Sequence, residues 1–216
     1  PIEQKQHGEG AHHLDRTLDE HGKAVVERLR DRVHVVGEVA HHVAVPLGVK
    51  KAQRQRLQVG KQVAADYADK DPIFLGILKG VVMFFADMVR AIPLDCQIDF
   101  MAVSSYGGGT QSSGKIRIQK DISVDLAGRH VVILEDILDS GLTLSHTAAY
   151  LKTKGPASLK ICTLLDKPDR RKAEVQADYV GFTIPNLFVV GYGLDFDENY
   201  RNLPYVGVLK PEAYMK

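Results

Sequence analysis

The chain has 216 residues, 44% of them hydrophobic and 25% charged, so it can bury one sizeable core, and its composition excludes a fibrous or disordered protein. Its 28 Lys and Arg residues almost balance 27 Asp and Glu residues, which gives no support for a nucleic-acid-coating surface. No apolar run approaches the roughly 18 residues of a membrane span, and the N-terminal region lacks a signal peptide's apolar segment. We therefore expect one globular domain plus an appended segment, in the cytoplasm, with no nucleic-acid or membrane partner.

The two cysteines, Cys96 and Cys162, lie far apart in the sequence, each in an apolar run. This placement predicts buried free thiols in a reducing compartment rather than a disulfide or a metal site. The chemistry of the chain must therefore come from other residues.

The first 48 residues differ from the rest because they hold seven of the nine histidines. Their apolar residues recur mostly every three or four positions, which predicts an amphipathic helix from a capping-box pattern at 17–20 to a point before Pro46. Some of the histidines could form a metal site, but solvated histidines on a helix face are the simpler interpretation. The histidines considered for such a metal site are His12, His13, His41 and His42. We assign segment 1–48 no function and place the functional domain at 49–216.

From residue 49 onward, predicted helices alternate with predicted strands. The elements are a helix over 51–68, a strand over 73–78, a helix from Val81, strands over 98–103 and 131–134, a helix to about residue 154, and an apolar run over 159–165. This alternation is typical of βαβ units, so we predict an α/β fold with a mainly parallel, twisted sheet flanked by helices. Ligands of such sheets bind beyond the carboxyl ends of the strands.

The segment VVILEDILDSGLTL, residues 131–144, carries the strongest chemical signal. If its four apolar residues form a buried strand, Glu135 and Asp136 lie at the carboxyl end of that strand and need polar partners. Three positions later comes the turn Asp139-Ser-Gly-Leu-Thr143, in which Gly141 permits unusual backbone angles.

This turn precedes a predicted helix, so the first N–H groups of that helix point outward together with the hydroxyls of Ser140 and Thr143. Such a group of donors favours a phosphate. The ligand therefore offers a phosphate to the turn and hydroxyls or a cation to the two adjacent carboxylates. A ribose 5-phosphate with Mg²⁺ meets both demands.

Two simpler interpretations compete with a sugar-phosphate site. The segment could be an ordinary strand, turn and helix, or it could be the Walker B strand of a nucleotide hydrolase. The Walker interpretation needs an upstream G-x-x-x-x-G-K-[ST] motif, which the chain lacks. The stretch over 76–80 resembles that motif only superficially.

The fourteen-residue segment resembles the phosphoribosyl-diphosphate signature of type I phosphoribosyltransferases, and Asp139 is similar to the residue found in their 6-oxopurine branch. Three further stretches agree in order and spacing: ILKG at 77–80, LLDKP at 164–168, and FVVGYGLD at 188–195 followed by YRNL at 200–203. The resemblance runs from about residue 58 to the C-terminus. It implies a Rossmann-like core with a small hood formed by N- and C-terminal segments, roughly 166–203.

The resemblance also implies an activity, namely Mg²⁺-dependent transfer of the phosphoribosyl group from 5-phosphoribosyl-1-pyrophosphate to N9 of hypoxanthine or guanine. A homodimer or homotetramer is expected. A regulator that senses the same donor and binds DNA or RNA is the alternative, disfavoured by the charge balance and by the lack of an obvious helix-turn-helix. Preference among hypoxanthine, guanine and xanthine stays open.

By resemblance, each motif receives a role. Glu135 and Asp136 would hold the ribose hydroxyls directly or through Mg²⁺, and the backbone and hydroxyls of Ser140, Gly141, Leu142 and Thr143 would hold the 5′-phosphate. Asp139 would be the general base or acid at purine N7.

The remaining implied contacts come from other loops. Lys79 and Gly80 would bind pyrophosphate through a backbone that can adopt a cis peptide, and Arg201 would bind it too, while Asp195 would be the second Mg²⁺ ligand. Lys167 would donate to the purine 6-oxo group, the Phe188 ring would stack on the base, and the backbone of Val189 would meet its edge. Ser105 and Tyr106 lie in a Gly- and Ser-rich loop over 104–114, which would close over the reacting atoms.

Overall fold

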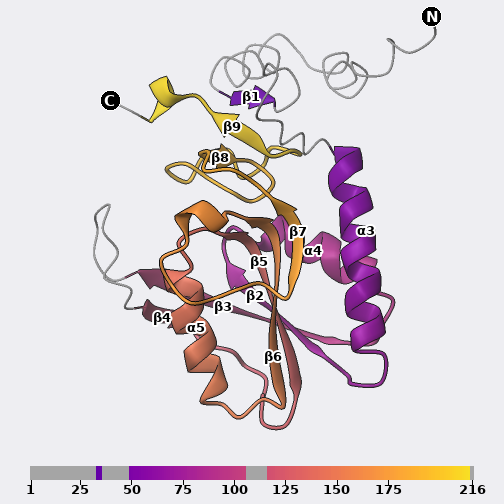
Figure 1. Cartoon of the computed structure of the whole chain (residues 1–216). Helices are drawn as coiled ribbons and strands as arrows, with labels where there is room; N and C mark the ends of the chain where they lie inside the picture. The colour runs from indigo at the N-terminus through magenta and orange to yellow at the C-terminus, as the bar shows by residue number, and fades with distance from the viewer. Residues whose placement is uncertain (1–32, 36–48, 106–115, 215–216) are drawn as a thin grey trace, which may run out of the picture.

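The computed structural model describes residues 33–35, 49–105 and 116–214. These residues form a six-stranded main sheet with helices on both faces, and a smaller three-stranded sheet beyond one edge of it (Figure 1). We call the smaller sheet, with the loop 191–206 that connects two of its strands, the hood.

The main sheet has the strand order β4-β3-β2-β5-β6-β7, and all neighbouring pairs except β3 with β4 are parallel. Its strands are β2 (Ile73–Leu78), β3 (Gln97–Ser105), β4 (Ile116–Lys120), β5 (His130–Leu138), β6 (Ser158–Asp166) and β7 (Tyr179–Thr183). The predicted α/β class with a mainly parallel sheet is therefore confirmed. Strands β4 and β7 were not predicted, because their half-exposed residues form no apolar run.

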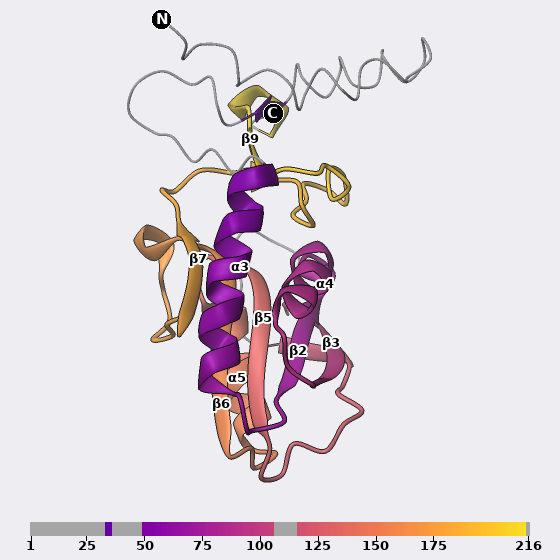
Figure 2. The ribbon, with the colours of Figure 1, turned by 90° about the vertical axis from the view of Figure 1, so that its right-hand side faces the viewer.

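Two helices cover one face of the main sheet and one helix covers the other (Figure 2). Helix α3 (Val49–Asp66) and helix α4 (Val82–Ala91) pack with Phe74, Val132 and Leu134, whereas α5 (Leu142–Lys152) packs with Ile73, Leu75 and Ile133. Adjacent strand residues thus face opposite helical layers, as the two-residue period of a strand requires. Because both faces are buried, these strands are continuous apolar runs.

The hood joins segments from both ends of the described chain. Its strands are β1 (Val33–Val35), β9 (Gly207–Leu209) and β8 (Val189–Val190), in that order and antiparallel. This arrangement confirms the predicted hood of N- and C-terminal segments. The predicted range 166–203 needs adjusting, because it includes β7, which belongs to the main sheet.

The helix predicted over 17–45 is wrong at residues 33–35, which form β1, while the rest of that prediction lies outside the described residues. Val33 and Val35 are β-branched and pair with Leu209 and Gly207 of β9, so a tertiary partner overrides the helical spacing. The thiol prediction also needs a correction: both cysteines are free, but Cys96 is only half-buried because it lies before β3 rather than within a strand.

The central strands end at one edge of the sheet, facing the hood. The chain passes from β2 outward to β3 and later returns to β5 on the other side of β2, so the strand order reverses between β2 and β5. Loops at such a reversal leave a crevice, which is the usual binding position in open α/β sheets. Within the described ranges, no helix is long and apolar enough to span a membrane.

Candidate active site

The turn from β5 to α5 is built for close approach to its main chain. Gly141 has φ +77°, a left-handed conformation that favours glycine, and a Cβ there would lie 2.5 Å from Val175 Cγ1. The first hydrogen bond of α5 runs from the Ser145 N–H to the Gly141 carbonyl, at 2.8 Å. The N–H groups before Ser145 are therefore outside the helix's own hydrogen bonding, an arrangement that suits an anion at the start of a helix.

A neighbouring loop after β6 holds the β5–α5 turn by hydrogen bonds to the main-chain carbonyls of the turn. The Ser140 carbonyl accepts a hydrogen bond from the Lys172 N–H at 2.8 Å, and Arg171 Nε donates to the Asp139 carbonyl at 3.2 Å. Arg171 also forms an ion pair with Asp166 at the end of β6. These bonds hold the turn without using the side chains that the sequence analysis assigned to ligand.

Glu135 and Asp136 lie inside β5, because the strand continues to Leu138 rather than ending at Leu134 as predicted. The longer strand is a consequence of pairing with β6 as far as Asp166. The pairing keeps one register throughout, with Glu135 opposite Thr163 and Ile137 opposite Leu165. Both acids therefore lie within the paired part of β5, before its last residues.

The two acids are costly to ionise where they lie. Burial, with a smaller contribution from the Asp136 charge, raises the pKa of Glu135 well above its ordinary value, and Glu135 Oε2 has no hydrogen-bond partner. Burial raises the pKa of Asp136 to about 6, although the Ile137 N–H donates to it at 2.8 Å. Carboxylates with raised pKa values and an unpaired oxygen are candidates for binding hydroxyls or a cation.

The turn after β2 meets both Asp136 and the hood. The Leu78–Lys79 peptide is cis, in agreement with the form implied by the resemblance. A Cβ at Gly80 would lie 1.8 Å from Asp136 Oδ2, and a Cβ at Gly193 of the hood loop would lie 1.9 Å from the Gly80 carbonyl oxygen. Only glycines fit these approaches, so β5, the β2–α4 turn and the hood loop meet at one point.

Lys167 follows β6 and lies beside Asp139, with 3.9 Å between Nζ and Oδ2. The lysine is 4% exposed, and this burial lowers its pKa, while the Asp139 charge acts in the opposite direction. Arg170 also pairs with Asp139, at 3.3 Å. A buried ammonium and a carboxylate thus share one corner next to the β5–α5 turn.

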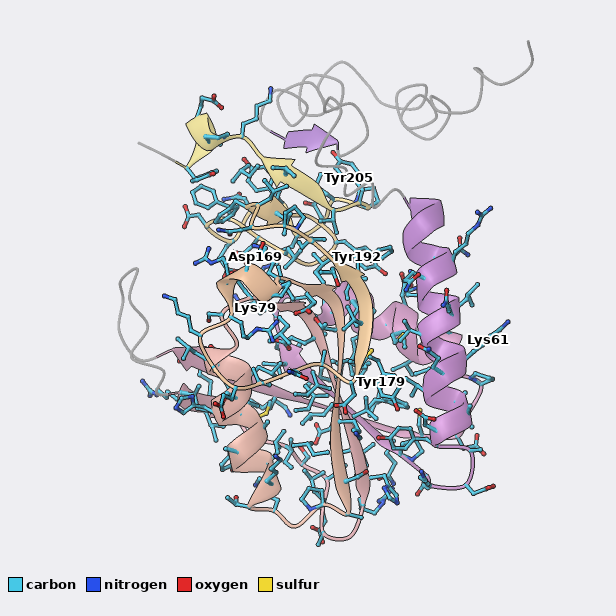
Figure 3. The ribbon with its side chains drawn as sticks, in the orientation of Figure 1. Lys61, Lys79, Asp169, Tyr179, Tyr192 and Tyr205 are labelled. Atoms are coloured by element: carbon cyan, nitrogen blue, oxygen red, sulfur yellow. The ribbon has the colours of Figure 1, made fainter. Side chains whose placement is uncertain are left out.

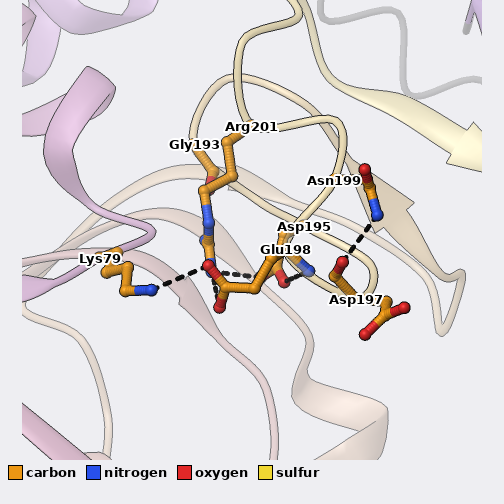
Figure 4. Close-up of polar contacts among 7 residues, drawn as sticks. All are labelled: Lys79, Gly193, Asp195, Asp197, Glu198, Asn199 and Arg201. Carbon is orange, nitrogen blue, oxygen red and sulfur yellow. Dashed lines mark hydrogen bonds and ion pairs between the residues drawn. The ribbon is translucent and has the colours of Figure 1, made fainter.

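The hood loop carries a cluster of opposite charges next to Lys79 (Figure 4). Arg201 Nη2 lies 2.9 Å from Asp195 and 3.2 Å from Glu198, and Lys79 Nζ lies 2.8 Å from Glu198. Arg201 Nη1 also donates to the Gly193 carbonyl at 2.8 Å. Two cations and two carboxylates therefore bridge the β2–α4 turn and the hood loop.

The Phe188 ring precedes β8 and is 37% exposed. It stacks on the Tyr214 ring with centroids 5.0 Å apart and meets the Phe196 ring edge-on at 5.6 Å. The predicted stacking ring is thus on the surface and supported by two further aromatic rings. Val189, the next residue, is buried in β8.

The structure brings most of the predicted residues to one edge of the main sheet, in two groups. Lys79, Gly80, Asp136, Asp195 and Arg201 meet at the hood loop, while Asp139 and Lys167 meet at the β5–α5 turn. Among the described residues, no group of three or more His, Cys, Asp or Glu side chains forms a preassembled metal site. The side chain of Ser105 and all of Tyr106 lie outside the described residues.

Sequence reasoning missed three charged residues of this region. Glu198 joins Lys79 to Arg201, Arg170 pairs with Asp139, and Arg171 fixes the β5–α5 turn. The adjacent arginines three residues after Lys167 were the available signal. Glu198 gave none, because an acidic residue in a polar loop is ordinary.

Comparison with known proteins defines the class of the molecule. Residues 34–197 match the family model of the phosphoribosyl transferase domain, so the chain belongs to the phosphoribosyltransferase family. The match begins inside the segment 1–48 that the sequence analysis set apart, one residue after the start of β1.

Individual members of this family are similar to the chain over most of its length. The chain is 56% identical over 157 residues to the hypoxanthine-guanine phosphoribosyltransferase of Streptococcus pneumoniae strain R6, covering 73% of this chain and 87% of that protein. It is 48% identical over 170 residues to the enzyme of the same name from Bacillus subtilis, covering 79% and 94%. A crystal structure of a hypoxanthine phosphoribosyltransferase from Staphylococcus aureus has a TM-score of 0.79 and 44% identity, covering 87% of this chain and 97% of that one.

Proposed function

We propose that the chain is a purine-salvage enzyme that transfers the phosphoribosyl group from 5-phosphoribosyl-1-pyrophosphate to N9 of hypoxanthine or guanine. The observation that carries this proposal is that two acids lie near the end of strand β5 and that the turn suited to an anion follows this strand directly. Glu135 and Asp136 lie just before the β5–α5 turn, so a ribose can meet the acids while its 5′-phosphate meets the N–H groups of that turn. The named relatives support the same substrates.

The base would lie between the β5–α5 turn and the hood. In this position the Phe188 ring offers an exposed face for stacking, and the Val189 backbone offers polar atoms to the base edge. Buried Lys167 would donate a hydrogen bond to the 6-oxo group. An adenine would present an amino group there, which is itself a donor, so this contact favours 6-oxopurines.

Bond making and bond breaking then balance within the site. Purine N9 forms a bond to C1′ of the ribose as the bond from C1′ to the pyrophosphate oxygen breaks, and the pyrophosphate leaves with that electron pair. Asp139, next to the base, would accept the proton that purine N7 loses. Its carboxylate would also stabilise positive charge that develops on the ribose.

The leaving pyrophosphate would meet cations from two segments. Lys79 and Arg201 lie on opposite sides of Glu198, so a diphosphate between the β2–α4 turn and the hood loop reaches both side chains. The backbone of Gly80 would add a close main-chain contact, because this position has no room for a side chain. Ser105 and Tyr106 would complete the contact from the 104–114 loop.

The available donors fit Mg²⁺, because Glu135, Asp136 and Asp195 offer carboxylate oxygens and one buried oxygen of Glu135 has no partner. Mg²⁺ characteristically uses one or two carboxylates together with substrate phosphates and water. When bound, the ion would neutralise charge on the diphosphate. The carboxylates of this chain would orient it and the ribose hydroxyls.

We also propose that the chain forms a homodimer or homotetramer. Exposed apolar side chains on α4 and β3 support a contact between copies, since Val82, Met83 and Ile98 are 40%, 41% and 51% exposed. Light scattering on the purified chain measures the assembly. A monomer at micromolar concentration would contradict this proposal.

The test of the activity is pyrophosphate release from 5-phosphoribosyl-1-pyrophosphate and Mg²⁺ with each of guanine, hypoxanthine, xanthine and adenine. We expect rapid release with guanine or hypoxanthine and slow release with adenine, with activity lost on chelation. Tight binding of the donor without release for any base would overturn the proposal and favour a donor-sensing regulator.

A further inference from the structure

Three side chains from distant parts of the sequence meet behind the candidate site. Arg56 of α3 donates from Nη1 to Asp87 of α4 and, at 2.8 Å, to the Tyr192 hydroxyl of the hood loop. The Tyr192 hydroxyl donates in turn to Asp87 Oδ2 at 2.5 Å. We call these three residues the hood clamp, because they join both helices of one face to the hood loop.

The hood clamp is poorly screened by solvent. The side chains of Arg56 and Asp87 are only 15% and 21% exposed. Burial, followed by the hydrogen bond to Asp87, raises the pKa of Tyr192 to about 12, so the hydroxyl keeps its proton and stays a donor at neutral pH. Partly buried hydrogen bonds between ionised groups are stronger than exposed ones.

Tyr192 occupies an unfavourable backbone conformation to make this contact. Its φ is +54°, in the left-handed region, and it lies between Gly191 and Gly193, whose φ angles are +94° and +102°. Non-glycine residues in this region are uncommon, and they persist where surrounding contacts hold them. The hood clamp supplies such a contact from the tyrosine side chain, and the Tyr192 N–H adds another by donating to the Leu203 carbonyl at 2.9 Å.

The residue after Tyr192 lies against the proposed diphosphate site. Gly193 packs on Gly80, where a Cβ would come within 1.9 Å of the Gly80 carbonyl oxygen, and the Gly193 carbonyl holds Arg201. Helix α4, which carries Asp87, begins two residues after Gly80. The hood clamp therefore connects the hood loop to the same helix that starts at the β2–α4 turn.

We infer that Arg56, Asp87 and Tyr192 are positioning residues that set the separation between the β2–α4 turn and the hood loop, so that both contact one diphosphate. This inference rests on the proposed function. None of the three is required to touch the donor. They act by fixing Gly193 and Arg201 relative to Lys79 and Gly80.

The chain offers a matched control for this inference. Tyr179 of β7 donates its hydroxyl to Asp66 of α3 at 2.6 Å, so it is a second tyrosine–aspartate bond to a helix on the same face of the sheet. Figure 3 shows Tyr192 on the hood side of the molecule and Tyr179 farther from the hood. A loss of general stability is common to both bonds, whereas a loss of diphosphate contact belongs only to Tyr192.

The experiment compares Tyr192→Phe and Tyr179→Phe in the full chain by calorimetric titration. Two ligands are used: 5-phosphoribosyl-1-pyrophosphate with Mg²⁺, and guanosine 5′-monophosphate, which has the ribose 5-phosphate but no diphosphate. We expect Tyr192→Phe to weaken donor binding about tenfold, the usual scale for one strong hydrogen bond, and to change nucleotide binding less than about twofold. Tyr179→Phe should leave the ratio of the two affinities unchanged.

Asp87→Asn supplies a second route to the same question. If the tyrosine acts through Asp87, the double variant Asp87→Asn with Tyr192→Phe should bind donor about as weakly as the weaker single variant, rather than showing the product of the two losses. Equal losses for donor and nucleotide, or no loss for either, would overturn the positioning role while wild-type turnover left the proposed function intact. Failure of the wild-type chain to bind the donor would overturn both.

Discussion

The β5–α5 turn and the hood loop face the same site but are built differently. The turn is held at its main-chain carbonyls from the loop after β6, by the Lys172 N–H at Ser140 and by the Arg171 side chain at Asp139. The hood loop has main-chain hydrogen bonds within itself, such as Tyr192 N–H to the Leu203 carbonyl, but it is joined to the helices and to Lys79 by side chains, namely the hood clamp and the ion pairs of Glu198. Its backbone includes positive φ angles at Tyr192, Asp197, Glu198 and Tyr200, which are unfavourable without such support.

This difference indicates that the two ends of one substrate can be bound by segments of unequal rigidity. A main-chain anion site is formed before ligand arrives, so it needs little rearrangement. A loop fixed by ion pairs can exchange those pairs for contacts with an anionic ligand. We therefore expect side-chain substitutions to affect chemistry at the turn and binding at the hood loop.

The largest expected effect is at the turn. Asp139→Asn keeps the size of the side chain but removes its ability to accept a proton, so we expect kcat to fall about 100-fold or more with little change in donor affinity. Steady-state rates and calorimetric donor binding measure the two quantities. An unchanged kcat would remove Asp139 from the proton transfer.

The next effect concerns the lysine beside that aspartate. Lys167→Gln removes the buried ammonium, so we expect the ratio of kcat/KM for guanine to that for adenine to fall roughly tenfold or more. Competition between the two bases in one assay measures the ratio directly. Lys160→Gln, at an exposed ion pair with Asp178, is the control for general effects of losing a lysine. An unaltered base preference would contradict the contact proposed for Lys167.

Asp136 lies between the β5–α5 turn and the hood loop, and its titration should change the free energy of unfolding. Its pKa is about 6 in the folded chain against an ordinary 3.8, so the folded state binds more protons between these values. The free energy of unfolding should therefore fall as pH rises from about 4 to about 6.

Asp136→Asn removes the carboxyl group responsible for part of this slope. We expect the ligand-free variant to be more stable than wild type at pH 7 by about 1–2 kcal/mol, a value reduced for the partial exposure of the group. Denaturant unfolding at pH 4 and pH 7 measures the difference. Lower stability of the variant at pH 7 would contradict the argument.

The smallest expected effect is at the hood loop. Glu198→Gln weakens the ion pairs that hold Lys79 and Arg201, which frees both cations for a diphosphate. Because the side chains of Lys79 and Glu198 are exposed, we expect donor affinity to rise only roughly two- to fivefold. Titration at low and high salt measures the gain, which should shrink with salt. Weaker donor binding would show that Glu198 instead positions the two cations.

The sequence predicted the part of the molecule where local pattern and burial agree. The buried parallel strands are apolar runs, and the helix predicted after the 139–143 turn is present as α5, which begins at Leu142. Segment β1 was mistaken for helix because only its distant partner β9 makes it a strand. Strand β5 was predicted too short, because two carboxylates inside a strand look like its end.

For the site, too, the sequence predicted some residues and missed others. The turn residues lie within one short segment, so their pattern identifies them. The hood clamp joins positions 56, 87 and 192, and no local pattern connects an arginine, an aspartate and a tyrosine at that separation. Contacts of this kind become visible only when the fold brings their elements together.

A crystal structure with guanosine 5′-monophosphate tests the central claim most directly. We predict that the 5′-phosphate lies against the N–H groups of residues 141–144 and that the ribose hydroxyls face Glu135 and Asp136, with the base on Phe188. A nucleotide whose phosphate lies away from that turn, or whose hydroxyls face away from both acids, would contradict the account.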